Sequence, residues 1–218
     1  MTSADWNAVG GVLQGIGQIS AAIAIAFAAY IGRNTFSDWK RQKQEERRID
    51  IAERTLTLAY RLRYDFHSVR APLIDQNELD EAESVLRQDS GGWWDEQSEA
   101  LKKRARTAQA IMNRLRHHHD DWQKIWELKP LALAFFGAAA EQHLDVFWQQ
   151  YRSLLVDAES YADLTGLGDE ASKLARETLF RECEESQITK TIDAAVSALE
   201  SELRPIVYSG RLAPSSRG

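Results

Sequence analysis

The sequence contains one cysteine and four prolines, and it has no charged residue from Trp6 to Gly32. The single Cys183 excludes an internal disulfide framework and a cysteine-based metal cluster, and it suits a reducing compartment. The scarcity of proline leaves long stretches rich in Ala, Leu, Glu, Arg and Gln, which favour helix. No segment shows the sustained alternation of apolar and polar residues that is typical of strands. We therefore predict an all-α fold.

Charge is distributed unevenly along the 218 residues, of which 44% are hydrophobic and 28% charged, as in globular proteins. Residues 1–32 carry a net charge of −1, residues 33–70 carry +4, and the remainder carries −9. A basic stretch beside an acidic body differs from the basic surface of a nucleic-acid-binding protein. We expect no nucleic-acid partner.

The apolar part of the uncharged stretch runs from Val9 to Ile31. As a helix it spans roughly 34 Å at about 1.5 Å per residue, which is enough to cross a hydrocarbon core of about 30 Å. The sequence therefore predicts a transmembrane helix over residues 9–32, after a short external N-terminus over residues 1–8. The helix is expected to continue into a cytoplasmic antiparallel helical bundle.

Two other interpretations of this stretch are a cleaved signal peptide and a buried helix of a soluble protein. A signal peptide begins with positive charge and has a shorter apolar run, whereas residues 1–5 contain no Lys or Arg. The buried helix stays open as an alternative, because Gln14, Gln18 and Ser20 lower the hydrophobicity of the run.

Basic residues follow the predicted span and none precedes it, which predicts that the N-terminus lies outside and the body in the cytoplasm. We call residues 39–48 the basic collar. Its cations are predicted to contact lipid headgroups; they are Lys40, Arg41, Lys43, Arg47 and Arg48.

Small and polar residues on the predicted span indicate self-association. Gly11 and Gly15 form a G-x-x-x-G pair, and the amides of Gln14 and Gln18 need hydrogen-bond partners that lipid cannot supply. Ala22 begins a second pair of small residues at the same spacing. We predict a homo-oligomer that forms through this face.

Apolar stripes predict five further helical segments that bury one another as a bundle. A basic juxtamembrane helix over 33–71, with near-heptad spacing typical of a coiled coil, precedes a cytoplasmic bundle over 72–208 and a flexible tail over 209–218. The expected helices cover residues 36–70, 77–88, 101–130, 138–164 and 169–207.

Tryptophans fall into two groups. Trp122, Trp126 and Trp148 lie at stripe spacing, so we expect them in the core. Trp93 and Trp94 follow a Gly-Gly turn, and we expect them to dock on another helix, on the membrane or on an unknown cytoplasmic protein partner, because they would otherwise be exposed.

No catalytic, metal or cofactor site is predicted. The run His117–His119 cannot direct three rings at one ion, because consecutive helical residues point about 100° apart. Arg114 and His119 nevertheless have the R-x4-H spacing that resembles the motif of HEPN ribonucleases, and Arg61 and His67 have R-x5-H spacing. The resemblance implies a helical dimer that cleaves RNA, although Leu115 follows Arg114 where that family has a polar residue.

The layout also resembles that of uncharacterised bacterial single-pass inner-membrane proteins, through the segments AIAFAAYIGRNTFSDWKRQK and WELKPLALAFFGAAAEQHLDVFWQQY. The resemblance implies an inner-membrane setting and no known activity. Our leading hypothesis is a non-enzymatic membrane protein whose bundle binds a partner or senses a signal. A membrane-acting effector and a HEPN-like ribonuclease are the alternatives.

Overall fold

The structure is a computed structural model that describes the backbone of residues 3–163, 179–180 and 186–212. Within these ranges it describes the side chains of residue 21 and of residues from 23 onward, apart from residues 34 and 210–212. Every element in the described part of the chain is helical, which confirms the prediction of an all-α fold.

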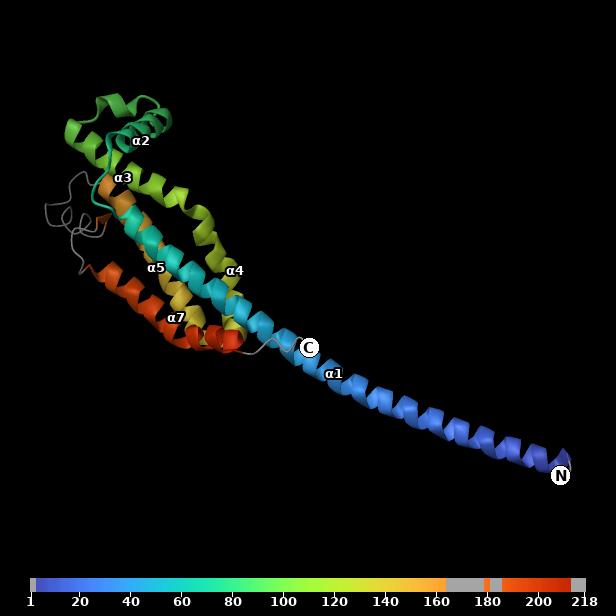
Figure 1. Ribbon diagram of the computed structural model, residues 1–218. Helices are drawn as coiled ribbons and strands as arrows, with labels where there is room; N and C mark the ends of the chain where they lie inside the picture. Colours follow the sequence, from blue (N-terminus) through green and yellow to red (C-terminus); the bar gives the residue numbers. More distant parts are fainter. Residues whose placement is uncertain (1–2, 164–178, 181–185, 213–218) are drawn as a thin grey trace. The chain divides into compact units, whose positions relative to one another are not determined.

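The chain forms two units, Met1–Arg47 and Arg48–Gly218. The first consists of the beginning of a single long helix, and the second contains the end of that helix and the bundle. In chain order the described helices are α1 (Ser3–Val69), α2 (Gln76–Asp89), the short 3-10 helix η1 (Trp93–Glu96), α3 (Glu99–His117), α4 (His119–Phe136), α5 (Ala138–Asp163) and α7 (Gln187–Leu212), as Figure 1 shows.

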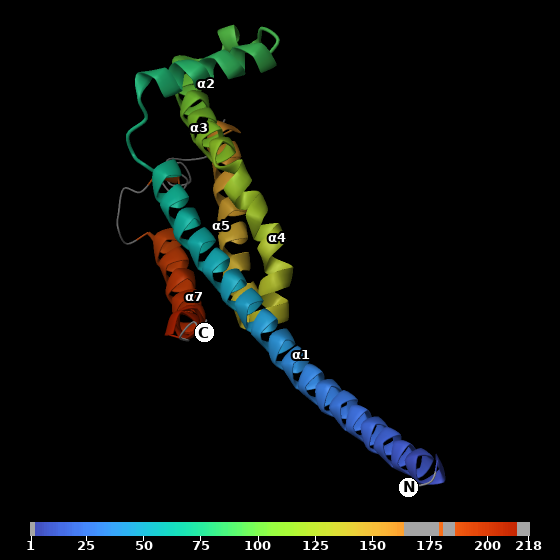
Figure 2. The ribbon, with the colours of Figure 1, turned by 45° about the vertical axis from the view of Figure 1, so that its right-hand side comes forward.

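Helix α5 is the hub of the bundle, since it packs against α3, α4 and α7. Helix α2 packs against α3 at one end of the bundle (Figures 1 and 2). Each of these helices has one apolar side, so the arrangement lets several stripes share one core. The prediction that the helices pack as a bundle is confirmed.

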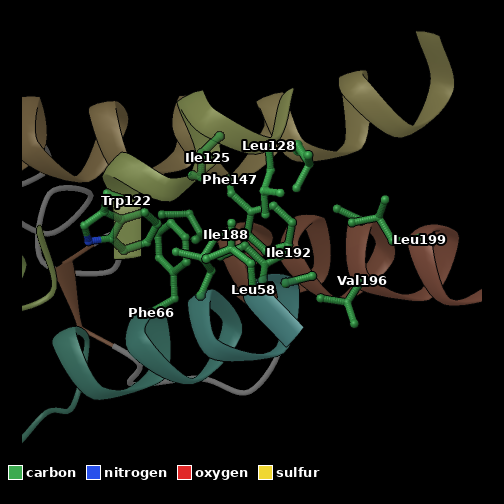
Figure 3. Packing of buried hydrophobic residues seen from close by; sticks show 14 of the residues in the cluster. Leu58, Phe66, Trp122, Ile125, Leu128, Phe147, Ile188, Ile192, Val196 and Leu199 are labelled. Atoms are coloured by element: carbon green, nitrogen blue, oxygen red, sulfur yellow. The ribbon is translucent and has the colours of Figure 1, made fainter. Parts of the chain in front are cut away.

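The core is built from residues of α1, α3, α4, α5 and α7. Figure 3 labels the part contributed by α1, α4, α5 and α7. Phe66 of α1 meets Trp122 of α4 edge to face, with ring centroids 4.8 Å apart. Ile188 and Ile192 of α7 lie in the same cluster. The second half of α1 is therefore a core helix, as its apolar stripe predicts.

Local signals explain several helix ends. Helix α1 stops at Val69, three residues before Pro72, because a proline disfavours helical geometry in the residue before it. Helix α2 begins with a capping box, in which Asp75 accepts from the Glu78 amide and Glu78 accepts from the Asp75 amide. The predicted end at residue 70 and the predicted boundaries 77–88 agree with the described ends of α1 and α2 to within one residue, and α5 begins at the predicted residue 138. The predicted end of that helix at residue 164 lies outside the described residues.

The predicted single helix over residues 101–130 is wrong. It is divided into α3 and α4 at His118, whose φ of −94° and ψ of 12° are not helical. The break rotates the apolar face of α4, so that Trp122, Ile125 and Leu128 are buried while Trp126 is 51% exposed. His119, which follows the break, is exposed.

Pro130 does not end the helix, because α4 continues to Phe136 and stops at Gly137, where φ is 92°. Proline removes one backbone hydrogen bond to the residue four positions earlier, here Trp126. Both Pro130 and Trp126 are exposed, so water can bond to the carbonyl that proline leaves unpaired. The free-energy cost of a proline inside a helix is therefore smaller at the exposed position of Pro130 than it would be in the core.

In the part of the chain that the structure describes, no helix is both long and apolar enough to cross a membrane. The predicted span over residues 9–32 is therefore not confirmed. The side chains of residues 3–20 and of Ala22 lie outside the described residues.

At the C-terminal end, α7 supplies Ile192, Leu199 and Leu203 to the core, as its stripe predicts. The helix extends to Leu212, beyond the predicted end at 207. The beginning of the predicted 169–207 helix and the end of the predicted tail lie outside the described residues.

Two tryptophans of α4 provide a test of this core. Trp122→Ala should lower the free energy of unfolding by about 3–5 kcal/mol, because it removes a fully buried indole and leaves a cavity. Trp126→Ala should cost less than half as much, since that indole is half exposed. Chemical denaturation followed by circular dichroism measures both, and equal losses would contradict the register described for α4.

Candidate functional site

The first candidate site is the part of α1 that we call the exposed segment, residues 21–47. Every side chain described there is exposed, including several large apolar ones. Ile25 is 70% exposed and Phe27 is 65% exposed. Residues two apart on a helix point to nearly opposite sides, so these two side chains and the alanines between and around them make the helix apolar on all sides. The large apolar members are Ile23, Ile25, Phe27, Tyr30, Ile31, Phe36 and Trp39.

The basic collar carries fewer unpaired charges than its sequence indicates. Arg41 lies 3.2 Å from Asp38, and Lys43 lies 2.7 Å from Glu46. Both ion pairs are formed within one face of the helix at i, i+3 spacing. Their attraction is weakened by water, because all four side chains are about half exposed or more.

The two adjacent cations that end the basic collar differ in their surroundings. Arg48 is partly buried, and its Nε has no hydrogen-bond partner among the described residues. Arg47 is exposed. Contact of these residues with headgroups remains a prediction, as it does for Lys40.

The predicted association face cannot be compared with the structure. The side chains concerned lie outside the described residues, although their backbone belongs to α1. They are those of Gly11, Gln14, Gly15, Gln18 and Ala22.

The adjacent tryptophans have different environments. Gly92, with φ of 101°, precedes η1 and turns the chain so that Trp94 is 1% exposed while Trp93 is 51% exposed. Trp94 is therefore buried and is not available as an exposed contact. Only Trp93 remains accessible to a partner in the way that the sequence predicts.

Arg114 fastens α3 to the end of α1 and the start of α2. Its guanidinium donates to both carboxylate oxygens of Glu78 at 2.7 Å. It also donates to three carbonyls of the chain that links the two helices, those of Val69 at 3.2 Å, Ala71 at 2.9 Å and Leu73 at 2.7 Å. These bonds use the geometry of the guanidinium fork, which a lysine lacks.

The arrangement separates the residues of the ribonuclease-like spacing. While Arg114 binds Glu78 and the carbonyls, His119 is exposed and its Nε2 lies 2.8 Å from Gln123. Arg61, of the second motif, donates to Asp121 at 3.3 Å. Both arginines therefore direct donors at protein groups.

A carboxylate–imidazole pair at the α3–α4 break was not predicted from the sequence. His118 Nδ1 lies 3.1 Å from Asp65 Oδ1, and the Asp65 side chain is 5% exposed. Burial raises the pKa of Asp65, a shift that the nearby charges of His118, Arg61 and Lys124 oppose and that of Asp121 reinforces. Asp65 and His118 are 53 positions apart, and no sequence pattern predicts a contact over that separation. The pair is therefore seen only in the folded structure.

His118 also lines a cleft of about 410 Å³ beside the Arg114 clamp. The lining is mostly polar and includes both signs of charge, with Glu81 and Arg114 among its members. Among the described residues, no group of three or more His, Cys, Asp or Glu side chains is arranged to hold a metal ion. The cleft is large enough for a small polar ligand, but its lining residues do not indicate a particular one.

Comparisons of the chain with protein-family models, with curated proteins and with solved structures found no significant match.

The Arg114–Glu78 contact predicts a specific dependence of stability on pH. Arg114 lowers the pKa of Glu78 below its ordinary value of 4.5, chiefly by hydrogen bonding. A lowered pKa in the folded state stabilises the protein above pH 4.5, and this contribution is lost as pH falls through the lowered pKa. Glu78→Gln should cost about 1–2 kcal/mol at pH 7 and almost nothing near pH 2. Urea unfolding at both pH values measures the difference, and an equal cost at both would contradict the ionic contact.

Asp65 predicts the opposite trend, because its pKa is raised by burial. A raised pKa contributes stability that is present below the ordinary value of 3.8 and is lost as pH rises through the folded value. Asp65→Asn keeps an acceptor for His118 and removes the buried charge. The variant should gain stability relative to the wild type as pH rises from 3 to 7. A constant difference over that range would show that Asp65 does not titrate abnormally.

Proposed function

We propose that the protein is a non-enzymatic membrane anchor and adaptor, whose helical bundle binds a protein partner at the cytoplasmic face of a bacterial inner membrane. The observation that carries the proposal is the exposed segment of α1, which is apolar on all sides between residues 23 and 31. A helix with apolar residues all round is stable only inside a large core or a bilayer.

Lipid is the simplest cover for this segment. Exposed apolar area costs about 25 cal/mol per Å², so several fully exposed large side chains in water are unfavourable. The sequence extends the same character back to Trp6 without a charge, over a length that matches a hydrocarbon core. Tyr30 and Trp39, both more than half exposed, have the amphipathic rings that favour a membrane–water boundary.

The distribution of charge supports the orientation. Lys and Arg follow the apolar segment and none precedes it, which favours retention of the following bundle in the cytoplasm. The bundle then has a net negative charge and presents Trp93 at a turn, a residue type that is common at the centres of protein interfaces.

A binding role is favoured over ribonuclease chemistry by the contacts of Arg114. Acid–base cleavage needs a histidine and an arginine that face one substrate phosphate. Arg114 is instead bonded to Glu78 and three backbone carbonyls, while His119 contacts Gln123.

Attachment to the membrane can be tested on the full chain expressed in bacteria. The protein should sediment with membranes and stay there after alkaline carbonate washing, because apolar burial does not depend on charge. Ile19→Arg combined with Ile23→Arg should release most of the protein, since an arginine near the middle of a span costs about 2.5–3.5 kcal/mol.

Tyr64→Arg is the matched control, because Tyr64 is an aromatic of α1 that is 71% exposed but lies in the bundle. This variant should remain in the membrane fraction. Release of the wild-type protein by carbonate would refute the anchor. Growth arrest with membrane depolarisation on overexpression would instead favour a membrane-acting effector.

A further inference from the structure

Two cations adjoin the apolar part of α1 without an ion pair among the described residues. They are Arg33, directly after Gly32, and Lys40, seven residues later. Both side chains are exposed. Their charges are therefore available to an external anion, unlike those of Arg41 and Lys43, which have carboxylate partners at 3.2 and 2.7 Å.

Helical geometry places these two cations on one side. A separation of seven residues is close to two turns, so Arg33 and Lys40 point in nearly the same direction. Asp38 is two residues from Lys40 and thus points to nearly the opposite side. The local field on the side of Arg33 and Lys40 is consequently positive.

An aromatic pair lies between the cations along the chain, with Phe36 on the side of Arg33 and Lys40 and Trp39 about 100° around the helix from Lys40. Phe36 and Trp39 stack with ring centroids 5.8 Å apart, and they are 64% and 54% exposed. Aromatic rings of this kind settle at the level of lipid headgroups, where one part is apolar and another meets water. The combination of two unpaired cations and an exposed aromatic pair suits a surface that is both anionic and partly apolar.

Arg33 and Lys40 lie closer to the predicted hydrocarbon edge than the later cations of the basic collar, so they are attracted more strongly to lipid headgroups. With Gly32 at the edge of the hydrocarbon, a rise of about 1.5 Å per residue puts Lys40 roughly 12 Å beyond that edge and Arg47 roughly 22 Å beyond it. The Debye length in physiological salt is about 8 Å, so attraction is largely screened at the greater distance. Long Lys and Arg side chains can also extend back toward the headgroups.

We propose that Arg33 and Lys40, with Phe36 and Trp39 between them, bind the headgroups of anionic phospholipids. Of the five basic-collar cations predicted from the sequence to contact headgroups, this site keeps only Lys40. It adds Arg33, which lies before the basic collar. The inference rests on the proposed anchorage, because the distances are counted from the edge of the bilayer.

The test uses the full-length protein reconstituted into phosphatidylcholine vesicles with a trace of lipid that is spin-labelled on its acyl chain. Electron spin resonance separates lipid held at the protein surface from free lipid, and it gives the association of labelled phosphatidylserine relative to labelled phosphatidylcholine. Each cation near the surface contributes about 1 kcal/mol, or about fivefold. The wild-type protein should prefer phosphatidylserine by at least fivefold, and the preference should fall in 1 M salt.

Two double variants with the same change of net charge decide which cations act. Arg33→Gln with Lys40→Gln should reduce the preference to less than twofold. Lys43→Gln with Arg47→Gln should leave it within a factor of two of the wild-type value. An equal loss in both would show that net charge alone, and not this site, attracts the lipid.

The outcomes also separate this inference from the anchor. Restricted lipid with no preference for phosphatidylserine would overturn the headgroup site and leave the anchor standing. No restricted lipid of either kind would mean that the protein has no surface within the bilayer. That result would overturn both the anchor and the headgroup site.

Discussion

Burial of the second half of α1 is the constraint on which the bundle depends. Ala52, Ala59 and Leu62 of this helix are completely inaccessible, and Phe66 packs on Trp122. Helices of this length gain most of their stability from packing of an apolar face. If α1 were withdrawn, α4 and α7 would expose the faces that now cover it, and the core in Figure 3 would lose one of its walls.

Polar contacts then fix how the helices can meet around that core. Arg63 of α1 faces Asp193 of α7 at 3.9 Å, and Tyr60 donates to Glu200 of the same helix. On another side of α1, Arg61 reaches Asp121 of α4. These contacts are mostly exposed and add little stability individually, but they favour one register of the helices over others. Arg114 acts differently, because three of its five bonds satisfy carbonyls at and just after the end of α1 that no helical turn follows, and the other two go to the Glu78 carboxylate.

The sequence predicts elements well where the signal is local. The capping residues around α2 and the stripe of α5 lie within a few residues of what they determine, and both helices are found as predicted. The break at His118 was missed because an apolar stripe continues across it, and a regular spacing contains no information on a change of direction. The partners of Asp65 and Arg114 lie 36 to 53 positions away in the chain, so they follow from the assembled bundle. The anchor, in contrast, is an inference from composition and exposure together.

A single residue, His118, joins α3 and α4, so the length of this junction is fixed by the packing of both helices. Both pack on α5, and His118 alone joins them while its ring meets Asp65. One added residue at this point would turn α4 by about 100° and move it by about 1.5 Å relative to α3. Trp122 would then leave the core. Length variation among related chains should consequently be absent from this junction and collect in turns such as Gly91–Gly92, where a Cβ would meet open space. At the α3–α4 junction, substitutions are therefore compatible with the fold, whereas insertions and deletions are not.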